Sequence, residues 1–288
     1  MKKILGVYSA PQPHWVGDGF PVRSLFSYES HGKQLSPFLL LDYAGPARFP
    51  PATKPRGVGE HPHRGFETVT IVYQGEVAHR DSTGQGGVIG PGDVQWMTAG
   101  AGILHEEFHS PDFTYRGGHL EMIQLWVNLP AVDKMTPPSY QAITAQQIPD
   151  VPLDDASGEI RVIAGEFQGH SGPARTFSPM LVRDVTLRAH ANVLLEIPEG
   201  WNTAVIARSG SSLINEHARA ATGQMVVLSS QGNQVQIQTA ADSQLLLIAG
   251  EPLNEPVEGY GPFVMNTKEE IRQAIRDFQQ GDFGKMSS

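Results

Sequence analysis

Two histidines separated by a single residue, His61 and His63, are the first sign of chemistry in this chain. Side chains two apart on an extended strand point to the same face, so both imidazoles would face one cavity. The run Phe66–Tyr73 that follows is mostly β-branched or aromatic, which favours a strand. Its residues that share the parity of the histidines are Glu67, Val69, Ile71 and Tyr73. One strand is therefore predicted to direct two imidazoles and a carboxylate into one cavity, with an apolar wall beyond them.

A third histidine, His105, stands two residues before Glu107. The same strand spacing places these two side chains on one face and Glu106 on the other. Three neutral imidazoles and one carboxylate suit a transition metal, with iron(II) as the first candidate and manganese, copper, nickel or zinc as alternatives. The chain has no cysteine, which excludes a thiolate site. Four protein ligands would leave two positions of an octahedral metal open for water, substrate or O₂.

Longer strings surround these residues: HPHRGFETVT, HRDSTG, PGDVQWMTAGAGILHEE, LWVNLP and, near the other end, GEPLNEPVEGYGPFVMNTKEEI. They resemble the motifs of the pirin family, part of the cupin superfamily, over nearly the whole chain. The pirin pattern takes its fourth metal ligand from the glutamate two residues after the last histidine. The resemblance therefore implies a metal held by the set His61, His63, His105 and Glu107. The general cupin pattern would instead use Glu67, which we expect to support a ligand without binding the metal.

The pirin resemblance also implies an activity, quercetin 2,3-dioxygenase. In that reaction Glu107 would take the proton of the flavonol 3-hydroxyl, and the central ring would open with release of carbon monoxide. The alternative is a non-catalytic iron protein, a transcriptional or metabolic cofactor whose metal state controls the binding of a protein partner. A cupin sugar isomerase is disfavoured, because no basic cluster for a sugar phosphate lies near the ligands. Flavonol turnover would discriminate between the first two hypotheses.

The composition of the chain argues against several classes of protein. Hydrophobic residues make up 40% of the 288 residues but are too dispersed for a membrane span. A formal net charge of −9 argues against direct binding to nucleic acid, which needs a basic surface. The apolar start of the chain ends at Pro11 before it reaches the length of a signal peptide. We expect a cytoplasmic monomer that meets a small aromatic substrate and O₂.

Short strands punctuated by 31 glycines and 22 prolines indicate an all-β fold. Ala204–Leu213 echoes Val69–Val77, and aligning Gly210 with Gly75 gives an offset of 135 residues. We therefore predict two tandem jelly-roll barrels of the cupin type, with boundaries at 1–135 and 153–288 and a proline-rich linker at 136–152. A capping box at Thr267 begins a predicted C-terminal helix, Lys268–Gln279.

The repeat allows the second barrel to be tested for metal ligands. At the offset of 135, the two histidines of the first pair become Glu196 and Pro198, and Glu67 becomes Asn202. At a second offset of 131, from the echo around Gly223, the other pair becomes Gln236 and Gln238. The second barrel is thus predicted to bind no metal. Three other histidines near the first site could line the pocket, but a structural role is favoured for each: His79, His109 and His119.

Overall fold

The computed structural model describes residues 1–10 and 12–286, which form two compact units. The first unit combines Gln12–Ser30 and Phe38–Ala145 with the chain from Asn254 onward. The second unit combines the N-terminal strand with His31–Pro37 and Gln146–Leu253. The predicted boundaries assigned the N-terminal strand to the first unit and the C-terminal segment to the second, whereas the structure has each of them in the opposite unit. Among the described residues, no helix has the length and apolar character needed to cross a membrane.

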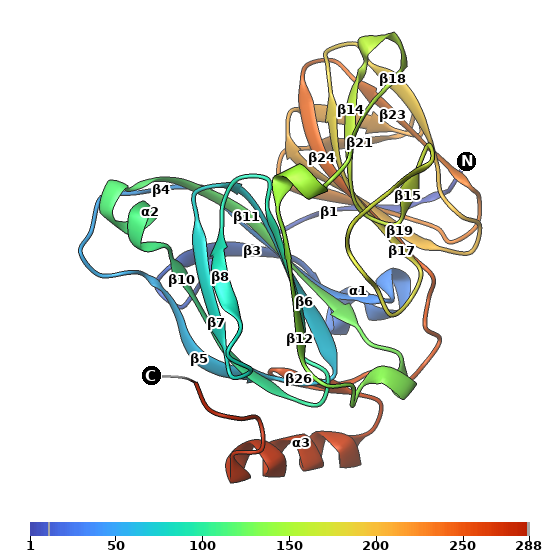
Figure 1. Ribbon diagram of the computed structural model, residues 1–288. Coiled ribbons are helices and arrows are strands. Elements are labelled where there is room, and N and C mark those ends of the chain that lie inside the picture. The colour runs from blue at the N-terminus through green and yellow to red at the C-terminus, as the bar shows by residue number, and fades with distance from the viewer. Residues whose placement is uncertain (11, 287–288) are drawn as a thin grey trace. The chain divides into compact units, whose positions relative to one another are not determined.

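The first unit is built from a seven-stranded and a four-stranded antiparallel sheet (Figure 1). In spatial order the large sheet contains β12 (Ser139–Ile143), β9 (Val94–Thr98), β6 (Phe66–Gln74), β11 (Gly118–Asn128), β4 (Phe38–Phe49), β3 (Phe20–Ser27) and β2 (His14–Val16). The small sheet contains β5 (Gly57–His63), β10 (Ile103–His109), β7 (Val77–Asp81) and β8 (Gly86–Ile89). Apolar side chains from both sheets, such as Val72 and Val77, share one buried core.

The second unit repeats this plan with the same numbers of strands. Its large sheet contains β1 (Ile4–Ser9), β22 (Gln224–Leu228), β19 (Asn202–Ser209), β24 (Ser243–Gly250), β17 (Met180–Leu187), β14 (Gly158–Ala164) and β13 (Asp150–Pro152). Its small sheet contains β18 (Asn192–Glu196), β23 (Gln234–Thr239), β20 (Ser211–Ile214) and β21 (Ala218–Ala221). Two hairpins lie outside these sheets: β15 (Glu166–Phe167) with β16 (His170–Ser171), and β25 (Glu258–Tyr260) with β26 (Phe263–Met265). The expected all-β duplication is confirmed.

The predicted linker contains an edge strand of the first unit. Tyr140 in β12 pairs with Met97 in β9, so the large sheet continues beyond the predicted boundary at residue 135. In the second unit, β1 pairs with β22 at the equivalent edge. Each unit thus completes its large sheet with a strand that follows or precedes the main repeat in the sequence. The prolines of the linker region concealed β12, because they interrupt the alternation by which strands are recognised.

The α-helices in the described part of the chain are α1 (Tyr28–Leu35), α2 (Pro111–Arg116) and α3 (Lys268–Gln280). Helix α3 is confirmed within one residue of its predicted end. Thr267 and Glu270 form the predicted capping box, and Gly281 ends the helix with a φ of 85°. The buried face of α3 packs against the first unit through Ile271 and Ala274, beside Phe263 of β26.

The C-terminal segment braces the turn that follows His63. The backbone N–H of Arg64 donates to the carbonyl of Pro262, and the N–H of Val264 donates to the carbonyl of Arg64. The guanidinium of Arg64 donates to the carboxylate of Asp277 in α3 (2.7 Å). On the other side of the turn, the buried ammonium of Lys134 donates to the Gly65 carbonyl (2.7 Å). The C-terminal string therefore helps to position the histidine strand, although nearly 200 residues separate them in the sequence.

Candidate metal centre

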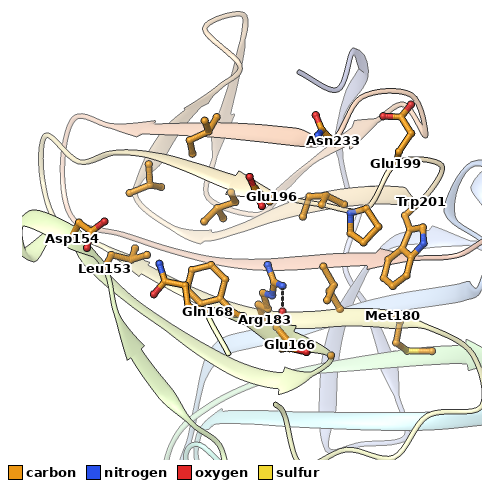
Figure 2. A pocket seen from close by; sticks show the side chains of 18 of the residues that line it. Leu153, Asp154, Glu166, Gln168, Met180, Arg183, Glu196, Glu199, Trp201 and Asn233 are labelled. Atoms are coloured by element: carbon orange, nitrogen blue, oxygen red, sulfur yellow. Dashed lines mark hydrogen bonds between the residues drawn. The ribbon is translucent and has the colours of Figure 1, made fainter. Parts of the chain in front are cut away.

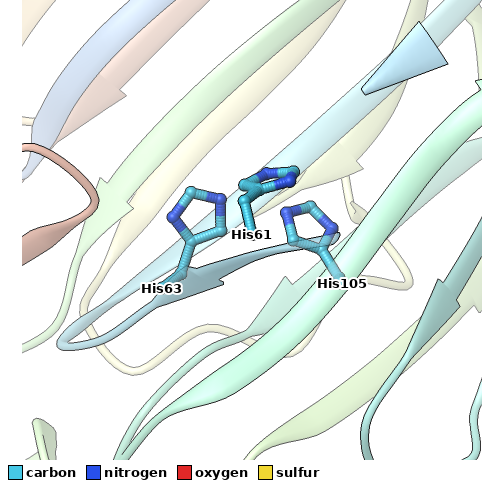
Figure 3. Close-up of side chains that lie close together, drawn as sticks. All are labelled: His61, His63 and His105. Atoms are coloured by element: carbon cyan, nitrogen blue, oxygen red, sulfur yellow. The ribbon is translucent and has the colours of Figure 1, made fainter. Parts of the chain in front are cut away.

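Three histidines from two paired strands converge in the first unit (Figure 3). His61 and His63 come from β5, and His105 of β10 lies directly opposite His61 in the pairing register. One ring nitrogen from each lies within 4.8 Å of the others. The inward alternation of β5 thus brings the two histidines of the HxH motif to the same side, as strand spacing predicts. These three side chains are the expected nitrogen donors of the site.

The environment of His63 and His105 keeps these two rings neutral. His63 and His105 are almost completely buried, with 4% and 0% of their surface exposed. Burial, followed by the positive charge that neighbouring histidines would carry, lowers the pKa of both well below the usual value of histidine. Neutral imidazole is the form that binds a metal. His61 is half-buried, at the more open side of the group.

Hydrogen bonds fix which nitrogen each ring can offer. Nδ1 of His61 donates to the Gly59 carbonyl (2.8 Å), which leaves Nε2 with its lone pair. The ring of His63 hydrogen-bonds the backbone of Pro262, and its Nδ1 has no partner among the described residues. Such bonds to the far nitrogen commonly fix the tautomer of metal-binding histidines. Each of these two rings therefore has one unprotonated nitrogen with which it can bind a metal.

A chain of two further residues orients His105. The carboxylate of Asp81 accepts a hydrogen bond from Nε2 of His79 (3.2 Å). A neutral His79 then has a lone pair on Nδ1, which lies 3.4 Å from Nδ1 of His105. We infer that His105 donates through Nδ1 and leaves Nε2, which has no partner in the described part of the protein, free for a metal. Tyr140 stacks on the ring of His79 with an interplanar angle of 8°.

The sequence did not reveal the roles of His79 and Asp81: a structural role was favoured for His79 over a place in the lining of the pocket. The string HRD carries the signal that could have identified them: alternation puts these two side chains on one face of β7. Burial opposes ionisation of Asp81, but hydrogen bonds from His79 and Thr83 outweigh it and lower its pKa. Asp81 is therefore a carboxylate at neutral pH, as an acceptor for His79 must be.

Glu107 is close to His105 but is only loosely held. Its carboxylate groups with His79 and His105 within 4.8 Å, and not with the other two histidines. Oε1 accepts a long hydrogen bond from Thr70 (3.3 Å), and Oε2 accepts another from Gln124 (3.4 Å). Neither partner is charged. A carboxylate with such weak restraints can move toward a metal and can exchange a proton.

Glu67 does not face the histidines, contrary to the single strand predicted through both motifs. Gly65, with a φ of 88°, forms a turn that ends β5 at His63 and starts β6 at Phe66. Thr70 of β6 reaches Glu107, so the alternate residues Glu67, Val69 and Ile71 point to the opposite face. Oε1 of Glu67 instead accepts a hydrogen bond from Thr98 (2.8 Å). The predicted apolar wall beside the metal is therefore wrong.

The face of β6 that does turn toward Glu107 carries polar groups. In the pairing register Thr70 lies between Gln95 of β9 and Gln124 of β11. Gln95 is completely buried, and neither atom of its amide has a partner among the described residues; the same holds for the hydroxyl of Thr68. An aromatic wall adjoins this row, because Trp126 stacks on Phe66 and contacts the ring of His63. The interior thus offers unused hydrogen-bonding groups beside a flat apolar surface.

Burial of Glu67 has a measurable consequence. Burial raises its pKa from 4.5 to about 7, against the opposing hydrogen bond from Thr98. The native state then binds this proton more tightly than the unfolded state, so the free energy of unfolding falls as pH rises from 4.5 to 7. Glutamine does not ionise, so Glu67→Gln lacks this pH-dependent loss of stability. The free energy of unfolding of the variant minus that of wild type should increase by up to about 3 kcal/mol between pH 4.5 and pH 8. Urea unfolding of both metal-stripped proteins at the two pH values measures it; a constant difference would contradict the burial argument.

The second unit places apolar side chains where the first has its ligands. His61 pairs with His105 in the first unit, and the inward pair at the equivalent place is Leu195 with Val235. The inward residues are Leu195, Ile197, Val235 and Ile237, which are all buried in the core. The predicted equivalents, such as Glu196 and Gln236, are one residue out of register and face outward or are half-exposed. Among the described residues, no metal-binding group of three lies in this unit.

Comparison with known proteins identifies the family to which the chain belongs. Residues 19–127 match the family model "Pirin", and residues 182–284 match "Pirin C-terminal cupin domain". A Pseudomonas aeruginosa protein named "Putative quercetin 2,3-dioxygenase" is 58% identical, with 98% of this chain and 99% of that protein aligned. Human pirin is 40% identical over 88% of this chain and 84% of its own. The crystal structure of an Acinetobacter baumannii quercetin 2,3-dioxygenase superposes with a TM-score of 0.97 and 56% identity, covering 99% of each chain. With two family models in sequence order and full-length relatives, the chain belongs to the pirin family of cupin proteins.

Proposed function

We propose that the protein is an iron-dependent dioxygenase that opens the central ring of flavonols such as quercetin. The observation that carries this proposal is the arrangement of His61, His63 and His105, whose free nitrogens turn toward one another while their other nitrogens are occupied. Glu107 would complete the ligand set. The names of the relatives from Pseudomonas and Acinetobacter support the same reaction class.

The donor chemistry fits iron(II). Two of the three rings are buried with a nitrogen that lacks a partner among the described residues, which is costly unless a ligand or ion engages it. Imidazole and carboxylate donors together suit iron(II), and they also accept manganese, copper, nickel or zinc. When bound, the metal would supply a Lewis-acidic position for a flavonol oxygen and the redox chemistry that O₂ requires.

The side chains around Glu107 have roles in this reaction. Glu107 accepts the proton of the flavonol 3-hydroxyl at a carboxylate oxygen, for which its weak bonds to Thr70 and Gln124 leave it available. The buried Gln95 amide offers a donor and an acceptor to substituents of the substrate. Trp126, stacked on Phe66, offers a flat surface to an aromatic ring.

The test is the absorbance of quercetin with iron-loaded protein. We expect the flavonol band to disappear in air, with release of carbon monoxide, and to persist under nitrogen. His105→Ala should show no turnover in air. The proposal fails if protein with measured iron leaves quercetin unchanged in air. In that case, a protein partner that binds the ferrous and ferric forms differently would favour the regulatory alternative.

A further inference from the structure

The second unit contains a cavity of about 1110 Å³ that the metal chemistry does not use. Strands from both of its sheets line the cavity, β17 on one side and β18 on the other, and the β15–β16 hairpin lies at its edge (Figure 2). Its volume lies slightly above the range of about 300–1,000 Å³ that is usual for pockets that hold small organic ligands, so it has room for one. All of its lining residues belong to the second unit, so the cavity is complete within that unit.

Among the described residues that line this cavity, Arg183 is the one cation, and it is buried. It is an inward-facing residue of β17, flanked at alternate positions by Leu181 and Val185 of the apolar core. Only 3% of its surface is exposed. Its guanidinium donates one hydrogen bond, from Nη2 to the carbonyl of Glu166, and lies 5.0 Å from the ring centroid of Phe167.

The remaining donors of Arg183 are not used. Nε and Nη1 are buried and have no acceptor in the described part of the chain. Burial lowers the pKa of Arg183 to about 10, so the side chain is still a cation at neutral pH. One carbonyl does not compensate for the hydration that a guanidinium loses, and buried charges are normally paired. An anion in the cavity would supply the missing partner, because the guanidinium fork matches a carboxylate.

The rest of the lining defines the ligand. The apolar part of the lining includes Leu195 and Val193 and the half-buried rings of Phe167 and Trp201, and the uncharged polar part includes Gln168 and Asn233. The other charged lining residues are acidic and exposed: Asp154, Asp155, Glu166, Glu196 and Glu199. Their field repels an anion in proportion to its charge, so it disfavours multiply charged anions such as nucleotides more than a monoanion. We propose that this cavity binds a small monocarboxylate with a flat apolar body, with its carboxylate on Arg183 and its body between Phe167 and Trp201.

Cinnamate and its neutral analogue cinnamamide form the matched pair of probes, measured by isothermal titration calorimetry. Cinnamate should bind at least about tenfold more tightly than cinnamamide, because the amide cannot form the charge-assisted pair. Arg183→Met should weaken cinnamate binding by at least about tenfold, whereas the exposed control Arg219→Met should leave it unchanged. The cinnamate affinity of Arg183→Lys should lie between those of wild type and Arg183→Met, since lysine keeps the positive charge but lacks the planar pair of donors of a guanidinium.

Two further readouts separate ligand binding from a structural role and from the metal site. Arg183→Met should raise the melting temperature of the ligand-free protein, because an apolar side chain of similar size replaces an unpaired buried charge. Cinnamate should bind equally well to the His61→Ala, His63→Ala protein, which makes this inference independent of the proposed dioxygenase activity.

Several outcomes would overturn the proposal. They are equal binding of the two probes, unchanged cinnamate binding in Arg183→Met, and no saturable cinnamate binding up to about 10 mM. Inorganic phosphate that binds more tightly than cinnamate, and loses its affinity in Arg183→Met, would contradict the monocarboxylate assignment. A lower melting temperature in Arg183→Met and Arg183→Lys, with cinnamate affinity intact, would show that Arg183 serves the fold alone.

Discussion

Glu107→Gln is expected to reduce quercetin turnover by at least about 100-fold, the effect of losing a positioned general base. The amide keeps the size of the side chain and can still contact Thr70 and Gln124, so the fold should be preserved. It cannot accept the proton of the substrate hydroxyl, and it is a poorer metal ligand than a carboxylate. The measurement is the initial rate of flavonol loss per bound iron, with iron quantified in the same sample.

Glu67→Gln is the matched control, because it makes the same chemical change at another buried glutamate of the first unit. The carboxylate of Glu67 accepts a hydrogen bond from Thr98 on the face of β6 opposite Thr70, away from the histidines, so the rate and the iron content of the variant should remain at the wild-type level. A large loss of iron or activity in Glu67→Gln, with little effect in Glu107→Gln, would show that the general cupin ligand set applies here.

The double variant His61→Ala, His63→Ala is expected to lose nearly all of its metal. Wild-type protein should carry one transition-metal ion per chain, mostly iron, and removing two imidazoles leaves too few donors to retain it. Elemental analysis after desalting measures the occupancy, and circular dichroism checks the fold.

The control for this variant removes two exposed histidines of the second unit, His170→Ala and His217→Ala. It should retain full occupancy. Because the second unit has apolar residues such as Leu195 and Val235 at the equivalent positions, no residual specific metal is expected in the His61→Ala, His63→Ala protein. Full occupancy in that protein would contradict the proposed ligand set.

The sequence was sufficient to place His61 with His63, and His105 with Glu107, on one face of an extended strand, because alternation is a local property. It failed at Gly65, where one turn separates two strands and reverses the face on which Glu67 lies. The same sensitivity explains the second unit. A register error of one residue exchanged the outward Glu196 for the inward Leu195, so the predicted absence of ligands rested on the wrong positions.

Local sequence patterns could not show that the N-terminal strand belongs to the second unit and the C-terminal segment to the first. Strand β1 pairs with β22 more than 200 residues later, and the segment around Pro262 reaches back to Arg64. Such pairings are decided by tertiary packing, which leaves no periodic signal in either partner. Arg183 was hidden for a similar reason: in the run Met180–Leu187 it occupies an inward position among apolar residues, where a charge is not expected.

The most direct test of the metal centre is the anomalous difference density of wild-type crystals, collected on both sides of the iron absorption edge. The structure and the proposed function together predict one peak per chain, bounded by His61, His63, His105 and Glu107, and none among the apolar residues at the equivalent place in the second unit. A peak held by His79 in place of His61, or one located in the second unit, would contradict this account.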